Sequence, residues 1–221
     1  MTTSHFGIKL RHMKRALSIL LMLAPALAFA QKFQDVTAKG APVSLAIKND
    51  RVDLGPYVAV HNESNKGILA YVAVTKTTDE RGQTRPCRSK ADYAFKPSIL
   101  RSQEENPLPC PMEPETPGAK VTDVVCGVVF VQFEDGTTWG NRETGKEMLD
   151  DRPKKLAFLK HLVETYDESG EDAFNAMLND RSLEGPEWLL AMMLKDADTP
   201  AIDLAKKQLA AAQGWRASGI F

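Results

Sequence analysis

Histidine is the side chain best suited to acid–base catalysis near neutral pH, and beyond residue 30 the chain holds only His61 and His161. His61 ends a predicted strand, and Glu63 and Ser64 follow it closely. Neighbours on an extended strand point to opposite faces, whereas a nucleophilic triad needs a base within reach of the hydroxyl. We therefore interpret His61 as a solvated strand end. His161 lies off the apolar face of a predicted helix and is interpreted as a surface residue.

Two acidic clusters are candidates for catalytic or metal sites. Glu134 and Asp135 are adjacent in a predicted turn, which does not set the separation of roughly 5 to 9 Å that glycosidase carboxylates need. Residues 167–172 hold four carboxylates but lack the alternating oxygen ligands of a calcium loop. The chain has no glycine-rich phosphate loop, nucleophile elbow or His-Glu-x-x-His pattern. We therefore expect no catalytic, metal or cofactor site, with catalysis by dispersed residues as the alternative.

Three cysteines remain to be placed: Cys87, Cys110 and Cys126. We favour a disulfide between Cys87 and Cys110, because it would close the least regular part of the chain, although any of three pairings is possible in principle. Closing such a loop contributes about 3 kcal/mol. Cys126 lies within an apolar strand and is expected to be a buried, inert thiol. The spacings match no zinc or redox motif.

The first thirty residues have the layout of a secretory signal peptide. Four basic residues and no acid precede an apolar run at residues 16–23, and Ala28-Phe29-Ala30 precedes Gln31. We expect cleavage between Ala30 and Gln31, with translation starting at either Met1 or Met13. The residue directly after the cleavage site is Gln31 and not cysteine, so we expect no lipid anchor. No later segment has the 18 consecutive apolar residues that a membrane span requires. The predicted location is periplasmic or secreted.

Charge disfavours two classes of partner. Residues 31–221 keep all 29 acidic residues and lose four of the 28 basic ones, which leaves a formal charge of −5. A modest negative charge disfavours binding to nucleic acid or to anionic lipid.

The stretch at residues 121–140 is the predicted centre of a sheet. Residues 121–133 are apolar on both faces of an extended strand, and an Asp-Gly turn follows. Further strands are predicted at residues 43–47, 57–61 and 67–74, with the last two most simply forming a hairpin. The pattern weakens over residues 77–118, where residues 93–100 could form one more strand and a proline-rich loop covers residues 106–118.

After Gly140 the apolar period changes from 2 to 3.6 residues, which predicts helices. We expect one helix from Pro153, a second after Ser169, a third from Gly185 and a fourth from Pro200 that Gly214 caps. The third is apolar all round and is predicted to be buried. The fold class is therefore α+β. An antiparallel β-sandwich-like, immunoglobulin-like domain (residues 31–142) follows the signal peptide (1–30) and precedes a helical part (143–221).

Two segments resemble exported proteins of environmental bacteria to which no activity is assigned. They read NESNKGILAYV at residues 62–72 and VVFVQFEDGTTWG at residues 128–140. The resemblance implies a bacterial, exported sheet domain and implies no activity.

The remaining functional signal is apolar. Met192 and Met193, with Trp188 nearby, could form an adaptable groove, although a helix that is apolar all round more commonly belongs to the core. We expect a binding or interaction module of the bacterial cell envelope, whose partner is an unidentified protein or envelope component. The alternatives are a hydrolase with dispersed catalytic residues and a structural protein that forms homo-oligomers through its C-terminal helices.

Overall fold

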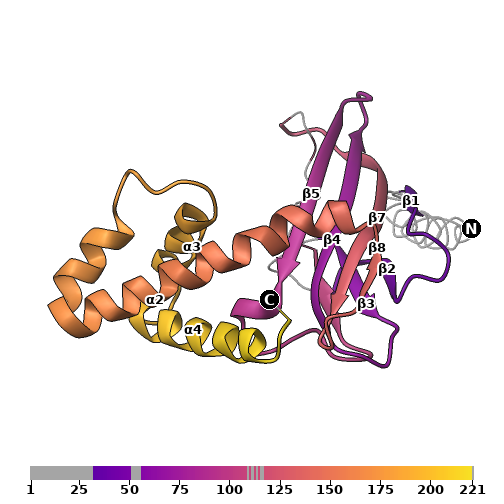
Figure 1. The fold of residues 1–221 in the computed structure, drawn as a ribbon. Coiled ribbons are helices and arrows are strands. Elements are labelled where there is room, and N and C mark those ends of the chain that lie inside the picture. Colours follow the sequence, from indigo (N-terminus) through magenta and orange to yellow (C-terminus); the bar gives the residue numbers. More distant parts are fainter. Residues whose placement is uncertain are drawn as a thin grey trace, which may run out of the picture.

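The computed structural model describes residues 32–50, 56–108, 110, 112, 114 and 117–220. The predicted signal peptide and its cleavage site at Ala30 and Gln31 lie outside the described residues. The described chain is an α+β structure with a mixed sheet, an antiparallel sheet and three C-terminal helices. The strands precede the helices, and the helices form an arm that extends away from the sheets (Figure 1).

The larger sheet has five strands and is mixed, so the predicted antiparallel arrangement holds for all of its strand pairs except one. Its order is β1 (Lys32–Asp35), β7 (Val121–Phe133), β4 (Ile68–Asp79) and β5 (Thr84–Asp92), and β8 (Thr138–Gly140) pairs with β7. Strand β1 runs parallel to β7, and the other pairs are antiparallel. The smaller sheet is antiparallel and has the order β2 (Val43–Lys48), β3 (Tyr57–Asn62) and β6 (Glu105–Pro107).

Strand β7 is central in the larger sheet, as its two apolar faces predict. Val124, Phe130 and Val131 are fully buried. The predicted turn after β7 also forms, because Phe133 N donates to Thr137 O and Gly136 has a φ of 81°. A positive φ is the conformation that favours glycine, which explains the Asp-Gly sequence.

The predicted hairpin between residues 57–61 and 67–74 is wrong, because β3 and β4 belong to different sheets. The side chain of Asn62 redirects the chain between them. Its Nδ2 donates to the carbonyls of Lys66 and Leu100, and its Oδ1 accepts from Ser64 N. Asn62 is fully buried, so this side chain satisfies backbone groups that a sheet ladder would otherwise satisfy.

The chain between residues 77 and 92 is more regular than its sequence predicts. Strand β4 continues to Asp79, and β5 returns antiparallel to form a long hairpin that projects beyond the rest of the sheet (Figure 1). The strand predicted at residues 93–100 is wrong, since a 3₁₀ turn, η2 (Tyr93–Phe95), begins there with Asp92 as its cap. Within the proline-rich segment, Pro107 lies in the short strand β6, which is an edge strand and therefore tolerates proline.

The first helix begins earlier than predicted. Helix α2 (Arg142–Leu178) starts at Arg142, where Asn141 Oδ1 accepts from Glu143 N, and Pro153 lies inside it. The segment before Pro153 is rich in charged residues and buries mainly Gly145, Met148 and Arg152, which leaves a weak apolar signal. At Gly170 the φ is 82° and the ψ is −173°, so the helical backbone breaks where a second helix was expected.

The other two helices are α3 (Gly185–Lys195) and α4 (Ala201–Ala217). Helix α3 begins at Gly185 with Pro186 in its first turn, as predicted. The predicted cap at Gly214 is wrong, because α4 continues past it. The helix ends instead at Ala217, with Ser218 as its cap. Gly219 follows the cap with a φ of 78°, and there Ile220 N donates to Trp215 O and Gly219 N to Arg216 O. This is the paired hydrogen-bond pattern of a glycine-terminated helix.

One main core joins the two sheets, η2 and the three helices. A smaller cluster under the first part of α2 contains Ala70, Val72, Phe130 and Met148. Beside it, Arg152 and Asp92 form a salt bridge of 2.9 Å whose arginine side chain is 1% exposed. None of the helices in the described chain combines the length and the apolar character that crossing a membrane requires.

Candidate functional site

Helix α3 exposes the apolar side chains of one of its sides, so the prediction that it is a buried helix is wrong. Trp188, Leu189 and Met193 are 50%, 49% and 48% exposed. Positions 188 and 189 lie one turn before 192 and 193, so these side chains share one side of the helix. We call Trp188, Leu189, Met192 and Met193 the α3 stripe.

The opposite side of α3 explains why the stripe is left outside. Leu190, Ala191 and Leu194 are buried and belong to the main core, where α3 packs against α2 and α4. A helix on the surface of a globular protein normally has one apolar face and one polar face. Helix α3 has two apolar faces and only one packing surface, so the second face meets solvent.

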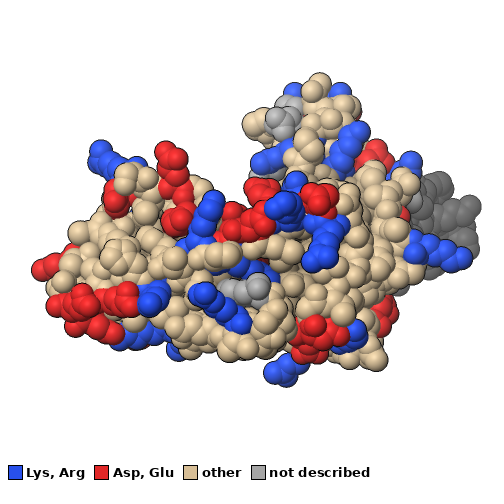
Figure 2. Space-filling model, viewed as in Figure 1, with Lys and Arg blue, Asp and Glu red and all other residues tan. Residues whose placement is uncertain are grey.

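The surroundings of the α3 stripe are acidic. Residues 180–198 carry five acidic and two basic side chains. Glu184 and Asp196 are the capping residues of α3, and both are exposed. Acidic side chains also gather at the far end of the helical arm (Figure 2). A partner that covers the stripe therefore meets an apolar strip between carboxylates, which favours a basic counterpart.

A second exposed apolar surface lies on the larger sheet, at the base of the β4–β5 hairpin. A depression of about 480 Å³ is lined by Val36, Val74 and Val125, with Pro86 and the side chains of Lys76 and Arg88 among its other walls. Val36 and Val74 are 48% and 37% exposed. We call this surface the valine depression. The sequence carries no local signal for it, because Val36 and Val74 are distant in sequence.

Gly127 shapes the valine depression. It pairs with Val74 across the sheet, and a Cβ at this position would lie 2.9 Å from Val36 Cγ2. The absence of a side chain therefore lets Val36 lie close to the sheet beside Val74. A larger residue at position 127 would push Val36 away and change the shape of the depression.

The charged residues that line the valine depression are two cations, Lys76 and Arg88. The segment of residues 76–90 carries five basic and two acidic side chains, and blue side chains outnumber red ones on the projecting hairpin in Figure 2. Arg88 donates to the Thr144 carbonyl at the start of α2. Lys76 is exposed and has no ion pair within the described part of the chain. An apolar surface between these two cations favours an acidic counterpart.

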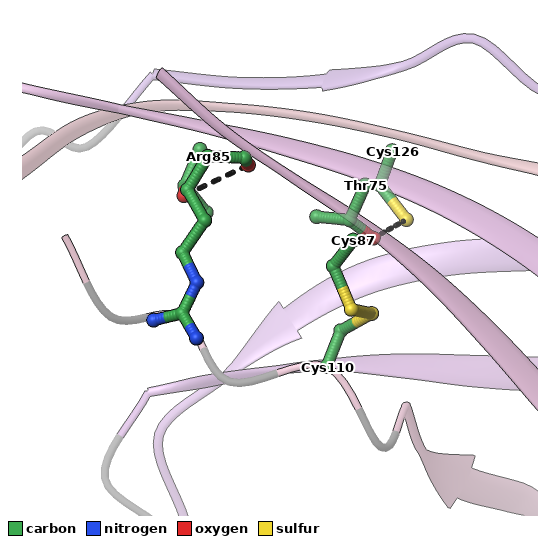
Figure 3. Close-up of a disulfide and its surroundings, with 6 residues drawn as sticks. Thr75, Arg85, Cys87, Cys110 and Cys126 are labelled. Carbon is green, nitrogen blue, oxygen red and sulfur yellow. Dashed lines mark hydrogen bonds between the residues drawn. A yellow bond between two sulfur atoms is a disulfide. The ribbon is translucent and has the colours of Figure 1, made fainter. Parts of the chain in front are cut away.

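A disulfide lies next to this depression. Cys87 of β5 and Cys110, which follows β6, are joined with a Cα–Cα distance of 6.1 Å, so the bond links the larger sheet to the segment that leaves the smaller one (Figure 3). Cys126 is fully buried and lies 3.1 Å from Thr75 Oγ1. Burial raises the pKa of its thiol, which keeps the thiol in its unreactive form, as expected for a structural cysteine.

The structure surrounds His61 with residues that the sequence did not suggest. His61 lies in register between Ser44 of β2 and Glu105 of β6, and directly paired side chains share a face. Ser44 Oγ, however, donates to Glu63 Oε1 at 2.6 Å, and Glu105 pairs with Lys48 at 3.0 Å. No hydrogen bond joins His61 to either residue in the described chain. Ser44, His61 and Glu105 therefore lack the contact between hydroxyl and base that a catalytic triad needs.

The other polar candidates have structural partners. His161 is exposed on α2, as expected. Glu134 Oε1 accepts from Gly67 N, and Asp135 accepts from Lys66 Nζ, so both acids stabilise the turns around them. In the acidic segment at residues 167–172, Asp167 pairs with Lys206 at 2.9 Å. No group of three or more potential metal ligands forms within the described residues.

Comparison with known proteins adds no relative: no family model, curated protein or solved structure matches the chain. The two exposed apolar surfaces, each with its own surrounding charge, are the features of the described structure that best fit a functional site.

Proposed function

We propose that this protein acts by binding, as an exported interaction module of the bacterial cell envelope whose contact surface is the α3 stripe. The observation that carries the proposal is the exposure of Trp188, Leu189 and Met193, each close to one half. Large apolar side chains that gather on a polar surface mark interaction sites more commonly than single exposed ones do. Tryptophan and methionine are also among the residues enriched at protein interfaces.

The chemistry of the stripe suits this role. Methionine side chains are flexible and polarisable, so Met192 and Met193 can adapt to a partner. Trp188 offers a large, rigid surface whose ring nitrogen can donate a hydrogen bond to the same partner. The buried half of α3 is fixed against α2 and α4, so the stripe is presented on a rigid support. Binding then requires little ordering of the helix itself.

Export and the finer fold are parts of the same proposal. The residue pattern of the first thirty positions supports export, and the Cys87–Cys110 bond supports an oxidising compartment such as the periplasm or the exterior. The inner faces of the two sheets contribute to one core, which supports a sandwich-like description of the sheet domain. The hydrolase alternative has less support, because Ser44 and Glu105 beside His61 have other partners and His161 is exposed on α2.

Site-specific photo-crosslinking in the native envelope tests the binding role. A photoreactive amino acid replaces Leu189 in one variant and His161 in a matched control, which is also exposed on the helical arm. We expect Leu189 to give a defined adduct that His161 does not give and that Met193→Glu abolishes. The same adducts from both positions, or none from Leu189, would contradict a binding role for the stripe.

A further inference from the structure

Building on the binding role proposed above for the α3 stripe, we propose that copies of this chain associate head to tail. The α3 stripe of one copy occupies the valine depression of the next. The partner at both surfaces is thus a second copy of the chain. The two surfaces have complementary relief and opposite charge, and each stays exposed within a single described chain.

The apolar parts of the two surfaces match. The stripe is a convex helix face that carries Leu189 and Met193, and the depression is a concave surface floored by Val36, Val74 and Val125. A leucine or methionine side chain has the volume of a few methylene groups and fits a hollow of about 480 Å³. Contact between the two surfaces therefore covers apolar area that one copy leaves in water, which favours association.

The charges around the two surfaces match as well. The residues from 180 to 198 have an excess of three acidic side chains, and the residues from 76 to 90 have an excess of three basic ones. Docking brings the acids that flank α3, such as Asp196, towards Lys76 and Arg88. Two copies that met through the same stripe would bring like charges together, which disfavours a symmetric pairing of stripe with stripe.

An interface between two different surfaces of one chain is heterologous. Each added copy leaves one stripe and one depression uncovered, so association continues into chains or rings rather than stopping at a dimer. The two surfaces are small. We therefore place their contact among the smallest protein interfaces, which bury less than about 1,200 Å² of accessible surface in total. We therefore expect a dissociation constant in the micromolar range or weaker.

Light scattering after size exclusion measures the association directly. The average mass of the purified protein should rise with concentration up to roughly 1 mM, as a micromolar or weaker constant requires. The rise should shrink in about 1 M salt, where the screening length falls to about 3 Å. A mass equal to one chain at every concentration would overturn the proposal.

Two complementary variants identify the surfaces. Leu189→Glu blocks the stripe and leaves the depression intact, whereas Val74→Glu blocks the depression and leaves the stripe intact. Each variant alone should stay monomeric. An equimolar mixture should form a dimer that grows no further, because only one usable stripe–depression pair remains. The mixture's average mass should therefore rise up to twofold, and a mixture that stays monomeric would overturn the proposal.

Further variants separate loss of contact from loss of fold. The Lys76→Glu variant changes only an exposed side chain and should also weaken association, even where Val74→Glu fails to fold. His161→Glu, an exposed change away from both surfaces, should associate like the wild type.

A Leu189 crosslink to a second copy in the envelope would support the pairing. A Leu189 crosslink only to another protein would overturn the pairing of copies while leaving the binding role intact. If Leu189 gave no crosslink to a second copy or to another protein, both the pairing and the binding role would be contradicted.

Discussion

Gly145 and Gly214 are both helical glycines, but their surroundings differ. A Cβ at Gly145 would lie 2.6 Å from atoms of the buried Phe130 ring, whereas a Cβ at Gly214 would meet nothing within 4 Å. Replacing glycine by alanine in a helix gains up to about 1 kcal/mol, and overpacking a core costs about 1 to 3 kcal/mol. We expect Gly145→Ala to lower the free energy of unfolding by about 1 to 2 kcal/mol and Gly214→Ala to raise it by about 0.5 to 1 kcal/mol.

Urea denaturation of the two variants measures both changes. Phe130→Leu provides a further check, because a smaller side chain at position 130 should reduce the cost of Gly145→Ala. An equal gain in stability from both alanines would show that the Phe130 ring does not press against position 145.

Asp135 gives a pH prediction in the turn after β7. The hydrogen bond from the Lys66 ammonium, followed by those from Thr137, lowers the pKa of its carboxyl from 3.8 to about 2. The folded protein thus binds this proton more weakly than the unfolded chain does. The interaction therefore stabilises the fold above pH 3.8, and its contribution is lost as the pH falls from 3.8 to about 2.

Carboxyl carbon shifts measured by NMR across this pH range report the pKa of Asp135. Lys66→Met should move the pKa upwards, because the first and largest cause of its depression is removed. Lys160→Met is the matched control, since Lys160 pairs with Glu164 on the helical arm and should leave Asp135 unchanged. A pKa of 3.8 or higher in the wild type would contradict the Lys66–Asp135 contact.

At the scale of elements, the disulfide holds β5 against the chain that leaves β6. The two cysteines are 23 residues apart in sequence, and closing a loop of this size stabilises a protein by about 3 kcal/mol. We expect Cys87→Ser with Cys110→Ser to lower the free energy of unfolding by about this amount. A reducing agent should produce the same loss in the wild type and none in the double variant. Equal stability with and without reductant in the wild type would contradict a structural role for the bond.

The elements also show how far the sequence predicts the fold. Strand β7, its turn, β2 and the start of α3 follow from local periodicity or turn chemistry, and the structure contains them. The β3–β4 hairpin was wrong because proximity in sequence does not fix pairing, and the buried side chain of Asn62 sends the chain to the other sheet. Strand β5 has no clear apolar alternation in the sequence, because its outward positions, such as Arg88 and Lys90, are charged.

The candidate surfaces show the same limit. The sequence predicts an apolar α3, but both sides of the helix are apolar, so periodicity cannot tell which side is covered. That depends on where α2 and α4 lie. The valine depression depends on the pairing of Val74 with Gly127 and on the position of Val36 beside them. Only the assembled sheet brings these three residues together.

At the scale of the whole molecule, charge is separated along the structure. The helical arm is acidic at its far end, and the β4–β5 hairpin is basic (Figure 2). A formal charge near zero for the full sequence hides this separation. The molecule is therefore electrostatically polar, which favours oriented encounters with other polar surfaces.

Sheets and helices share one core, so we expect the whole described structure to unfold as a single unit. Phe158 and Leu162 of α2 belong to the same buried cluster as Tyr71 of β4 and Tyr93 of η2, and α4 contacts η2. Separating the arm from the sheets would expose both sides of that cluster to water, which makes a half-folded state unfavourable.

Tryptophan fluorescence distinguishes the two parts, because Trp139 lies in β8 while Trp188 and Trp215 lie in α3 and α4. Trp188→Phe with Trp215→Phe leaves a reporter on the sheet, and Trp139→Phe leaves reporters on the helices. Each reporter's urea midpoint should coincide with the midpoint from far-ultraviolet circular dichroism of the same variant, as two-state unfolding requires. A helical reporter whose urea midpoint is lower than the circular dichroism midpoint of the same variant would show that the arm unfolds independently. The contacts of α2 and α4 with the sheet domain would then contribute little to the stability of the arm.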